Sequence, residues 1–174
     1  MSCYTPTVKR ALCFVIGLSL TGISFADEAS DLKKHIQSEM NKASQCLLKK
    51  DVAGAEKILR ANFDKNFVNT GTKGEKVTLD QQLNQMKVQM AAIKAMKKVD
   101  YKAVSVKVKG NKAEASETSE LIMVIANPQT KKDMTIRQTS KGVSTLEKRA
   151  GKWWVMRSKD SEVRLFVDGK EVKR

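Results

Sequence analysis

The sequence predicts an α+β fold in which three helices precede an antiparallel sheet and cover one of its faces. Apolar residues recur at helical spacing in the first half of the chain, and from Val104 onward they alternate with polar residues as in strands. No internal repeat, low-complexity tract or linker interrupts this order. Helices followed by a run of strands are typical of layered α+β domains, so we expect one such domain.

The first 26 residues have the organisation of a secretory signal peptide. Lys9 and Arg10 precede an apolar run at residues 11–20, and small residues then lead to Ala26. We expect cleavage after Ala26, which leaves residues 27–174 as a single secreted or periplasmic domain. The alternative is a membrane anchor, but a spanning helix needs about 20 apolar residues. This run is shorter, so no membrane span is expected after cleavage.

The chain is strongly basic, with 33 lysine and arginine residues, 19 aspartate and glutamate residues and a net charge of +14. Such a charge favours encounters with anionic surfaces, so binding of an anionic envelope polymer is one alternative role. The lysines are scattered, and aromatic residues make up only 5% of the chain. A single-stranded nucleic-acid platform needs a basic groove with exposed stacking rings, so we expect no specific nucleic-acid partner.

Residue types that hold metals or cofactors are scarce. After the predicted signal peptide the chain keeps one histidine, His35, and one cysteine, Cys46. No HxxxH or CxxC spacing, phosphate-binding glycine loop or Gly-x-Ser-x-Gly motif is present. We therefore expect no metal, no cofactor and no internal disulfide. Cys46 is interpreted as a small buried residue of the first helix, with a link between two chains as the alternative.

The first two helices are predicted from an apolar stripe and a capping residue. One helix is expected over Asp27 to Lys50, where the stripe consists of Leu32, Ile36, Met40, Ala43 and Leu47. Asp51 is expected to cap the start of a shorter second helix. Residues 67–78 are rich in glycine, threonine and asparagine and show no helical stripe, so an irregular strand and turn is predicted there.

A capping box marks the start of the third helix. Thr78 and Gln81 have the spacing at which each side chain bonds to the backbone amide of the other residue. The apolar stripe that follows consists of Leu79, Leu83, Met86, Met90 and Ile93. This pattern predicts a helix that ends near Val99.

Gly110 and Asn111 suit the two-residue turn of a hairpin. A tight register places Val108 opposite Ala113, Val106 opposite Ala115 and Lys107 opposite Glu114, so small residues line one side of the hairpin. Further strands are predicted at residues 121–126, 134–149 and 153–158, with a last extended piece at 162–167.

Three segments resemble the nuclear transport factor 2-like superfamily, which includes SnoaL-like and ketosteroid-isomerase-like proteins. They are KKDVAGAEKI at the second helix, FVNTGTKGEKVTLDQQL after it, and RAGKWWVMRS near the end. The resemblance implies a cystatin-like cone, with three N-terminal helices packed on the concave face of a curved antiparallel sheet. It also implies that the cone encloses a pocket and that homodimers form through the convex face. Within the superfamily, the chain resembles small exported members of unknown function.

Catalytic members of that superfamily place Asp, His or Tyr groups inside the cone. His35 has no identified carboxylate partner and is interpreted as a surface or boundary residue. Alternation along the strand puts Glu117 on the same face as Ala113 and Ala115, so Glu117 and Tyr101 are the candidates for an isomerase-like carboxylate base and phenol. The alternative, which we favour, is that Glu117 pairs with basic neighbours in solvent and that the chain is not an enzyme.

A soft apolar cavity is the expected binding site. Flexible methionines on the helices that face a sheet lined by small residues would leave room for a small apolar ligand. The expected ligand-binding residues are Met40, Met86, Met90, Ala113, Ala115 and Trp153. The alternative is that the methionines are ordinary core residues. The predicted role is thus non-catalytic binding of a small apolar ligand or a protein partner.

Trp153 and Trp154 are adjacent, so a strand presents them on opposite faces. The resemblance through Trp153-x-Val155 places those two residues on the concave face. Trp154 and Met156 then lie on the convex face, where a large exposed ring forms a contact surface. We expect a homodimer to form through that surface.

Overall fold

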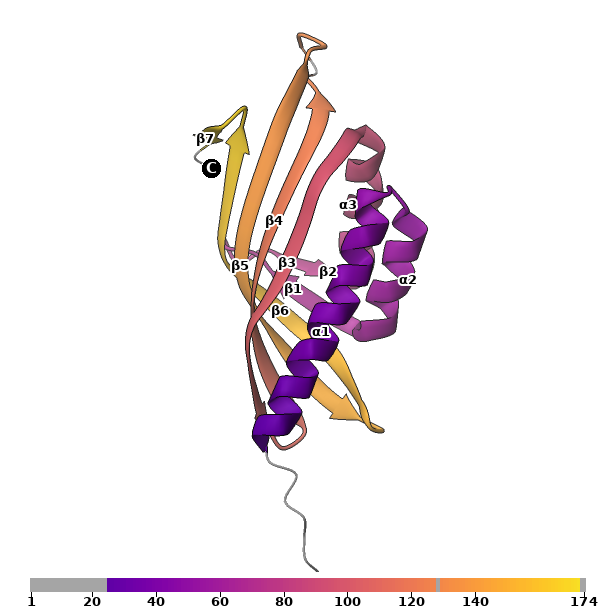
Figure 1. Ribbon diagram of the computed structural model, residues 1–174, viewed down its shortest axis with the longest axis vertical. Helices are drawn as coiled ribbons and strands as arrows, with labels where there is room; N and C mark the ends of the chain where they lie inside the picture. The colour runs from indigo at the N-terminus through magenta and orange to yellow at the C-terminus, as the bar shows by residue number, and fades with distance from the viewer. Residues whose placement is uncertain (1–24, 128, 173–174) are drawn as a thin grey trace, which may run out of the picture.

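The computed structural model describes residues 25–127 and 129–172 (Figure 1). Within them the chain forms three helices and seven strands: α1 Phe25–Leu48, α2 Val52–Asn62, β1 Phe63–Thr70, β2 Lys76–Thr78, α3 Leu79–Ala92, β3 Ile93–Lys109, β4 Lys112–Ala126, β5 Asp133–Arg149, β6 Lys152–Val167 and β7 Lys170–Val172. Helix α1 starts two residues before the predicted cleavage site, and the rest of the predicted signal peptide lies outside the described residues. None of the described helices is apolar enough over the length of a membrane span.

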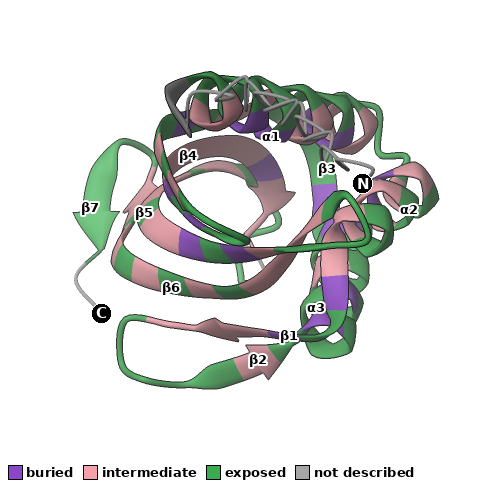
Figure 2. Cartoon of the chain, turned by 90° about the horizontal axis from the view of Figure 1, so that it is seen from below, coloured by how far each residue is buried: buried purple, intermediate pink, exposed green. Residues whose placement is uncertain are grey.

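The strands form one curved sheet in the order β2-β1-β6-β5-β4-β3, with β7 paired to β6. Every pair is antiparallel except β1 with β6, which is parallel, so the sheet is mixed. Figure 2 shows the long strands β3 to β6 curving around a central space, with α1 across one side and α2 and α3 beside it. The three helices therefore lie on the concave side, and the α+β fold is the predicted one.

Local capping residues start α2 and α3 as predicted. The carboxylate of Asp51 accepts the backbone N–H of Gly54 at 2.8 Å, so it is the N-cap of α2. Both bonds of the capping box form at α3: the N–H of Gln81 donates to the Thr78 hydroxyl at 3.3 Å, and the N–H of Thr78 donates to the Gln81 side chain at 2.9 Å. The two helix starts follow from contacts within four residues.

The prediction that α3 continues to Val99 is wrong, because α3 ends at Ala92. Ile93 is the last residue of the apolar stripe, but its backbone pairs with Ile125 of β4, and its side chain is buried. The long strand β3 begins at this residue. Pairing with a strand some thirty residues away therefore overrides the helical pattern of the local sequence.

The hairpin between β3 and β4 has the predicted register, with Val108 opposite Ala113, Val106 opposite Ala115 and Lys107 opposite Glu114. The turn between β5 and β6, at Ala150 and Gly151, uses positive φ angles of 48° and 79°. After this turn, β6 runs without a break from Lys152 to Val167, where the sequence predicted two separate pieces.

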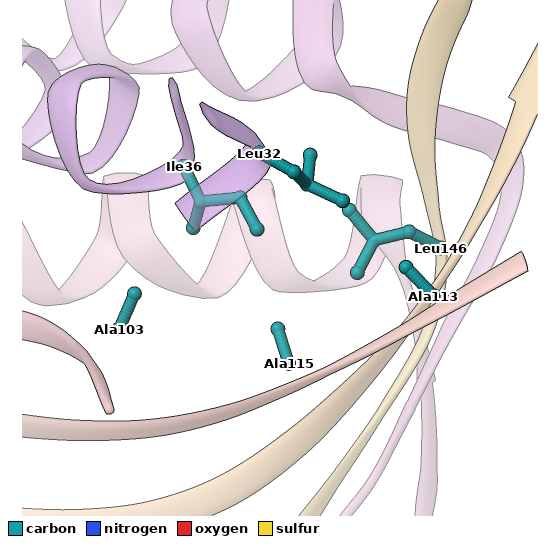
Figure 3. Close-up of a cluster of buried hydrophobic side chains, with 6 residues drawn as sticks. All are labelled: Leu32, Ile36, Ala103, Ala113, Ala115 and Leu146. Atoms are coloured by element: carbon teal, nitrogen blue, oxygen red, sulfur yellow. The ribbon is translucent and has the colours of Figure 1, made fainter. Parts of the chain in front are cut away.

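Two clusters of buried side chains hold the helices on the sheet. In the first, Leu32 and Ile36 of α1 lie over Leu146 and three alanines of β3 and β4: Ala103, Ala113 and Ala115 (Figure 3). The small alanine side chains allow α1 to approach the strands closely, so side chains fill the space between α1 and this part of the sheet. The second cluster, Phe67, Leu79 and Leu83, joins α3 to β1.

Candidate functional site

A cavity of about 480 Å³ lies between the three helices and the concave face of the sheet. Its volume is in the range of sites that bind small molecules. The helices contribute apolar side chains to it, among them Met40, Leu47, Ile58, Leu59 and Met86, and polar ones, among them Glu39, Gln82 and Gln89. The sheet also contributes both kinds. The polar groups that the sheet supplies form the polar side of the cavity.

The polar side is organised around Glu117 of β4. The Tyr101 phenol on β3 and the Ser144 hydroxyl on β5 both form hydrogen bonds with its carboxyl group. Ser144 also shares a hydrogen bond of 2.7 Å with the hydroxyl of Ser158 on β6. Three neighbouring strands thus hold the orientation of one carboxyl group.

Burial controls the ionisation of this group. Desolvation raises the pKa of Glu117 above its ordinary value of 4.5, and the hydrogen bonds from Tyr101 and Ser144 oppose this rise without cancelling it. The negative charge of Asp160 raises the pKa of Glu117 further. Burial also raises the pKa of Tyr101, with the charge of Glu117 adding to it, so the phenol stays protonated.

Asp160 lies on the same row of the sheet as Glu117, with Gly142 between them. Glu117 is paired with Gly142, and Gly142 is paired with Asp160. The side-chain amide of Asn69 on β1 donates to Asp160 at 3.2 Å. The other end of that amide, Asn69 Oδ1, is buried and has no hydrogen-bond partner within residues 25–127 and 129–172. This row brings two carboxyl groups and a free acceptor to one part of the cavity.

Bulges in β6 decide which of its residues face the cavity. Met156 and Ser161 are each an extra residue relative to β5, because the register shifts at these two points. Each extra residue reverses the alternation of side chains. The cavity-facing residues of β6 are therefore Trp153, Val155, Ser158, Asp160 and Val163.

The sequence did not identify Asp160, Asn69, Ser144 or Ser158 as site residues. Strict alternation from Trp153 would have placed Asp160 outside the cone. One local signal was present: Gly142 is isolated within a strand pattern, and such glycines often mark a bulge or a close approach.

No protein-family model matches the sequence, and no curated protein matches it either. Solved structures do match. A conserved protein from Planctomyces limnophilus aligns with a TM-score of 0.58 at 11% identity, over 78% of this chain and 95% of its own. A nuclear transport factor 2-like superfamily protein from Salmonella enterica serovar Typhimurium aligns with a TM-score of 0.54 at 16% identity, over 76% of this chain and 91% of its own. The chain has the nuclear transport factor 2-like fold.

A ketosteroid isomerase-like protein from Erwinia carotovora atroseptica also shares this fold, with a TM-score of 0.51 at 13% identity, over 82% of this chain and 97% of its own. Identities this low show a common architecture and leave activity undecided, because one fold supports unrelated functions. The family resemblance seen in the sequence is confirmed as a likeness of fold.

In the nuclear transport factor 2-like fold, some of the predicted ligand-binding residues line the cavity and others do not. Met40, Met86 and Trp153 line the cavity. Ala113 and Ala115 are buried beneath α1, and Met90 is buried on α3; these three are not among the residues that line it. The predicted base and phenol, Glu117 and Tyr101, both lie in the lining. His35 is exposed and contributes to the edge of the cavity.

The two tryptophans occupy opposite faces of β6. Trp153 packs against the first core cluster, and the Lys148 ammonium lies 5.8 Å from its ring centre. Trp154 points the other way and is half-buried, with the Lys152 ammonium 4.0 Å from its ring centre. Met156 is also half-buried.

Metal ligands do not gather in the described part of the chain, where no three His, Cys, Asp or Glu residues are placed to hold an ion. Cys46 is a free, half-buried thiol on α1.

Proposed function

We propose that the chain is an exported, non-catalytic binding protein that holds a small, largely apolar ligand inside the cone. The observation that carries this proposal is the cavity itself, where methionine and leucine side chains of the helices lie across from the hydrogen-bonded polar groups around Glu117 on the sheet. Such pockets bind through apolar contact and use a few polar groups to fix orientation. The cavity volume of about 480 Å³ suits a molecule of modest size.

The helices supply the adaptable part of this site. Met40 of α1 and Met86 of α3 line the cavity, and a flexible thioether adjusts its shape to the ligand. Leu59 of α2 lines the same space and packs against the core cluster of Phe67, Leu79 and Leu83. A larger side chain at Leu59 or Met86 would therefore reduce the cavity.

The test is binding of the neutral apolar dye N-phenyl-1-naphthylamine, measured by its fluorescence. We expect Leu59→Phe and Met86→Phe to weaken dye binding at least fivefold. Val88→Phe is the matched control, because Val88 lies on α3 with 73% of its surface exposed. Thermal unfolding of each variant checks that it is folded. Equal dye binding by all three variants would contradict the proposed site.

Native mass spectrometry of the protein purified from its exported fraction provides a second readout. We expect a bound molecule on the wild type that is lost from Met86→Phe. The mass of the protein itself would give the N-terminus, for which we propose Asp27. A chain that retains the first 26 residues would contradict the proposed export with cleavage.

A competing proposal is an isomerase-like enzyme. The observation in its favour is that Tyr101 is hydrogen bonded to Glu117 within the cavity. In this proposal Glu117 removes a proton beside a carbonyl group, and Tyr101 donates a hydrogen bond to the resulting enolate oxygen. Deuterium exchange at the α-carbon of a cyclic ketone tests it. Exchange that Glu117→Gln abolishes would support the enzyme and overturn the non-catalytic role.

A further inference from the structure

The charge of the cavity is opposite to that of the chain. Lysine and arginine account for 33 of the 174 residues, yet none of them is among the described residues that line the cavity. Four acidic residues do line it: Glu39, Asp100, Glu117 and Asp160. The interior therefore favours positive charge, even though the net charge of the protein is positive.

Two of these acidic residues have a positive partner on the protein. The Lys42 ammonium lies 2.5 Å from the Glu39 carboxylate, and the Lys98 ammonium lies 3.8 Å from that of Asp100. The other two have only neutral partners among the described residues. Glu117 bonds with Tyr101 and Ser144, and Asp160 bonds with Asn69.

Gly142 keeps the space between these two carboxyl groups free of a side chain. A Cβ atom built on Gly142 would lie 3.0 Å from the backbone oxygen of Lys159 and 3.5 Å from Oδ1 of Asp160. Any other residue here would therefore press its Cβ against the Lys159 backbone and place a side chain in contact with Asp160. The buried Oδ1 of Asn69 adds a third acceptor beside Asp160, and none of the described residues donates to it.

The ligand that satisfies this set of groups is a donor with a positive charge. A wholly apolar ligand would leave the Asn69 oxygen and two carboxyl groups buried without new partners, which is costly. An anionic ligand would be repelled by Glu117 and Asp160. A metal ion is not favoured, because no three suitable ligands gather in the described residues.

We propose that the cavity binds an apolar amine, with its protonated nitrogen between Glu117 and Asp160 and its apolar body against the helices. This inference rests on the proposed binding function and adds the chemical class of the ligand. Asp160 and Glu117 supply the counter-charge, and Asn69 Oδ1 accepts a further N–H. The methionine and leucine side chains of α1, α2 and α3 contact the hydrocarbon.

Three compounds with the same apolar body test the proposal: 1-adamantylamine, 1-adamantanol and 1-adamantanecarboxylate. Titration calorimetry at pH 7 is expected to show that the amine binds at least tenfold more tightly than the alcohol. The carboxylate is expected not to bind. Asp160→Asn and Glu117→Gln should each weaken binding of the amine about tenfold and weaken binding of the alcohol much less, because the alcohol carries no charge.

The matched control is Glu114→Gln, because Glu114 is an exposed carboxylate on the same strand as Glu117 but outside the cavity lining. It should leave binding of all three compounds unchanged. Equal affinities for amine and alcohol, insensitive to Glu117→Gln and Asp160→Asn, would overturn the amine proposal while the cavity function stands. If none of the compounds binds and the apolar dye does not bind either, both proposals fail.

Discussion

Gln37 of α1 accepts the backbone N–H of Ala103 on β3 at 3.0 Å, and the same side-chain amide donates to the carbonyl of Tyr101 at 2.7 Å. Strand β3 is at the edge of the sheet, so these backbone groups have no partner strand on that side. Lys33 of α1 makes a similar contact with the carbonyl of Val104 at 2.7 Å. Helix α1 therefore covers the edge with side chains and prevents it from pairing with another chain.

Gln37→Met removes these two hydrogen bonds, together with the one that the same amide donates to exposed Asn41 at 2.8 Å, and nearly preserves the side-chain volume. We expect the free energy of unfolding to fall by about 1–3 kcal/mol, the cost of leaving partly buried polar groups without partners. Urea unfolding measures this change. Gln45→Met, at an exposed position on α1, is the control. Equal stability of the two variants would show that the edge contacts contribute little.

Glu117 is expected to make stability depend on pH in a defined direction. Its pKa is raised in the folded protein, so as the pH rises above 4.5 the unfolded chain ionises first and is favoured. The contribution of Glu117 is fully present below that pH and is lost as the pH rises through the folded-state pKa. We expect the wild type to lose stability relative to Glu117→Gln between pH 4 and 8. Urea unfolding at each pH would show it, and a constant difference between the two proteins would refute it.

The capping box at α3 is expected to contribute about 1 kcal/mol, as such caps commonly do. Thr78→Ala removes the hydroxyl that accepts the N–H of Gln81. Thermal unfolding should show a lower Tm than for the wild type. Thr72→Ala, in the exposed turn between β1 and β2, should have no such effect.

The two tryptophans are expected to differ in what they support. Trp153→Ala removes a ring that packs on the core, so we expect a loss of about 2–4 kcal/mol in unfolding free energy. We propose that the convex face forms a homodimer, so Trp154→Ala should change stability less and should give sedimentation at the rate of the monomer. An unchanged mass together with lost stability would indicate that Trp154 also serves the fold.

Features that depend on neighbouring residues were predictable from the sequence. The caps at Asp51 and Thr78 and the register around Gly110 all arise within a few residues, and the structure contains them. The end of α3 was not predictable in this way, because it depends on the pairing of Ile93 with Ile125. The residues from Ile93 to Val99 include no proline or glycine that would end the helix at Ala92.

In the candidate site too, some features follow from the local sequence and others depend on pairing with distant strands. Alternation places Glu117 inside the cone because β4 pairs with β5 without a shift from Lys112 to Ala126. Asp160 is on a strand with two bulges. The face of the sheet on which its side chain lies can be assigned only when the register of β6 with β5 is known. On the polar side of the cavity, the sequence therefore identified Glu117 and Tyr101, whereas Asp160, Asn69, Ser144 and Ser158 depended on tertiary structure.

The parallel pairing of β1 with β6 has a consequence for synthesis of the protein. Phe63 pairs with Val155, and Asn69 pairs with Ser158, about ninety residues later in the chain. While the ribosome is still making β5, β1 is complete but has no β6 to pair with. The edge of β1 that later pairs with β6 stays exposed until then. A chain truncated before Lys152 should therefore aggregate rather than fold in part.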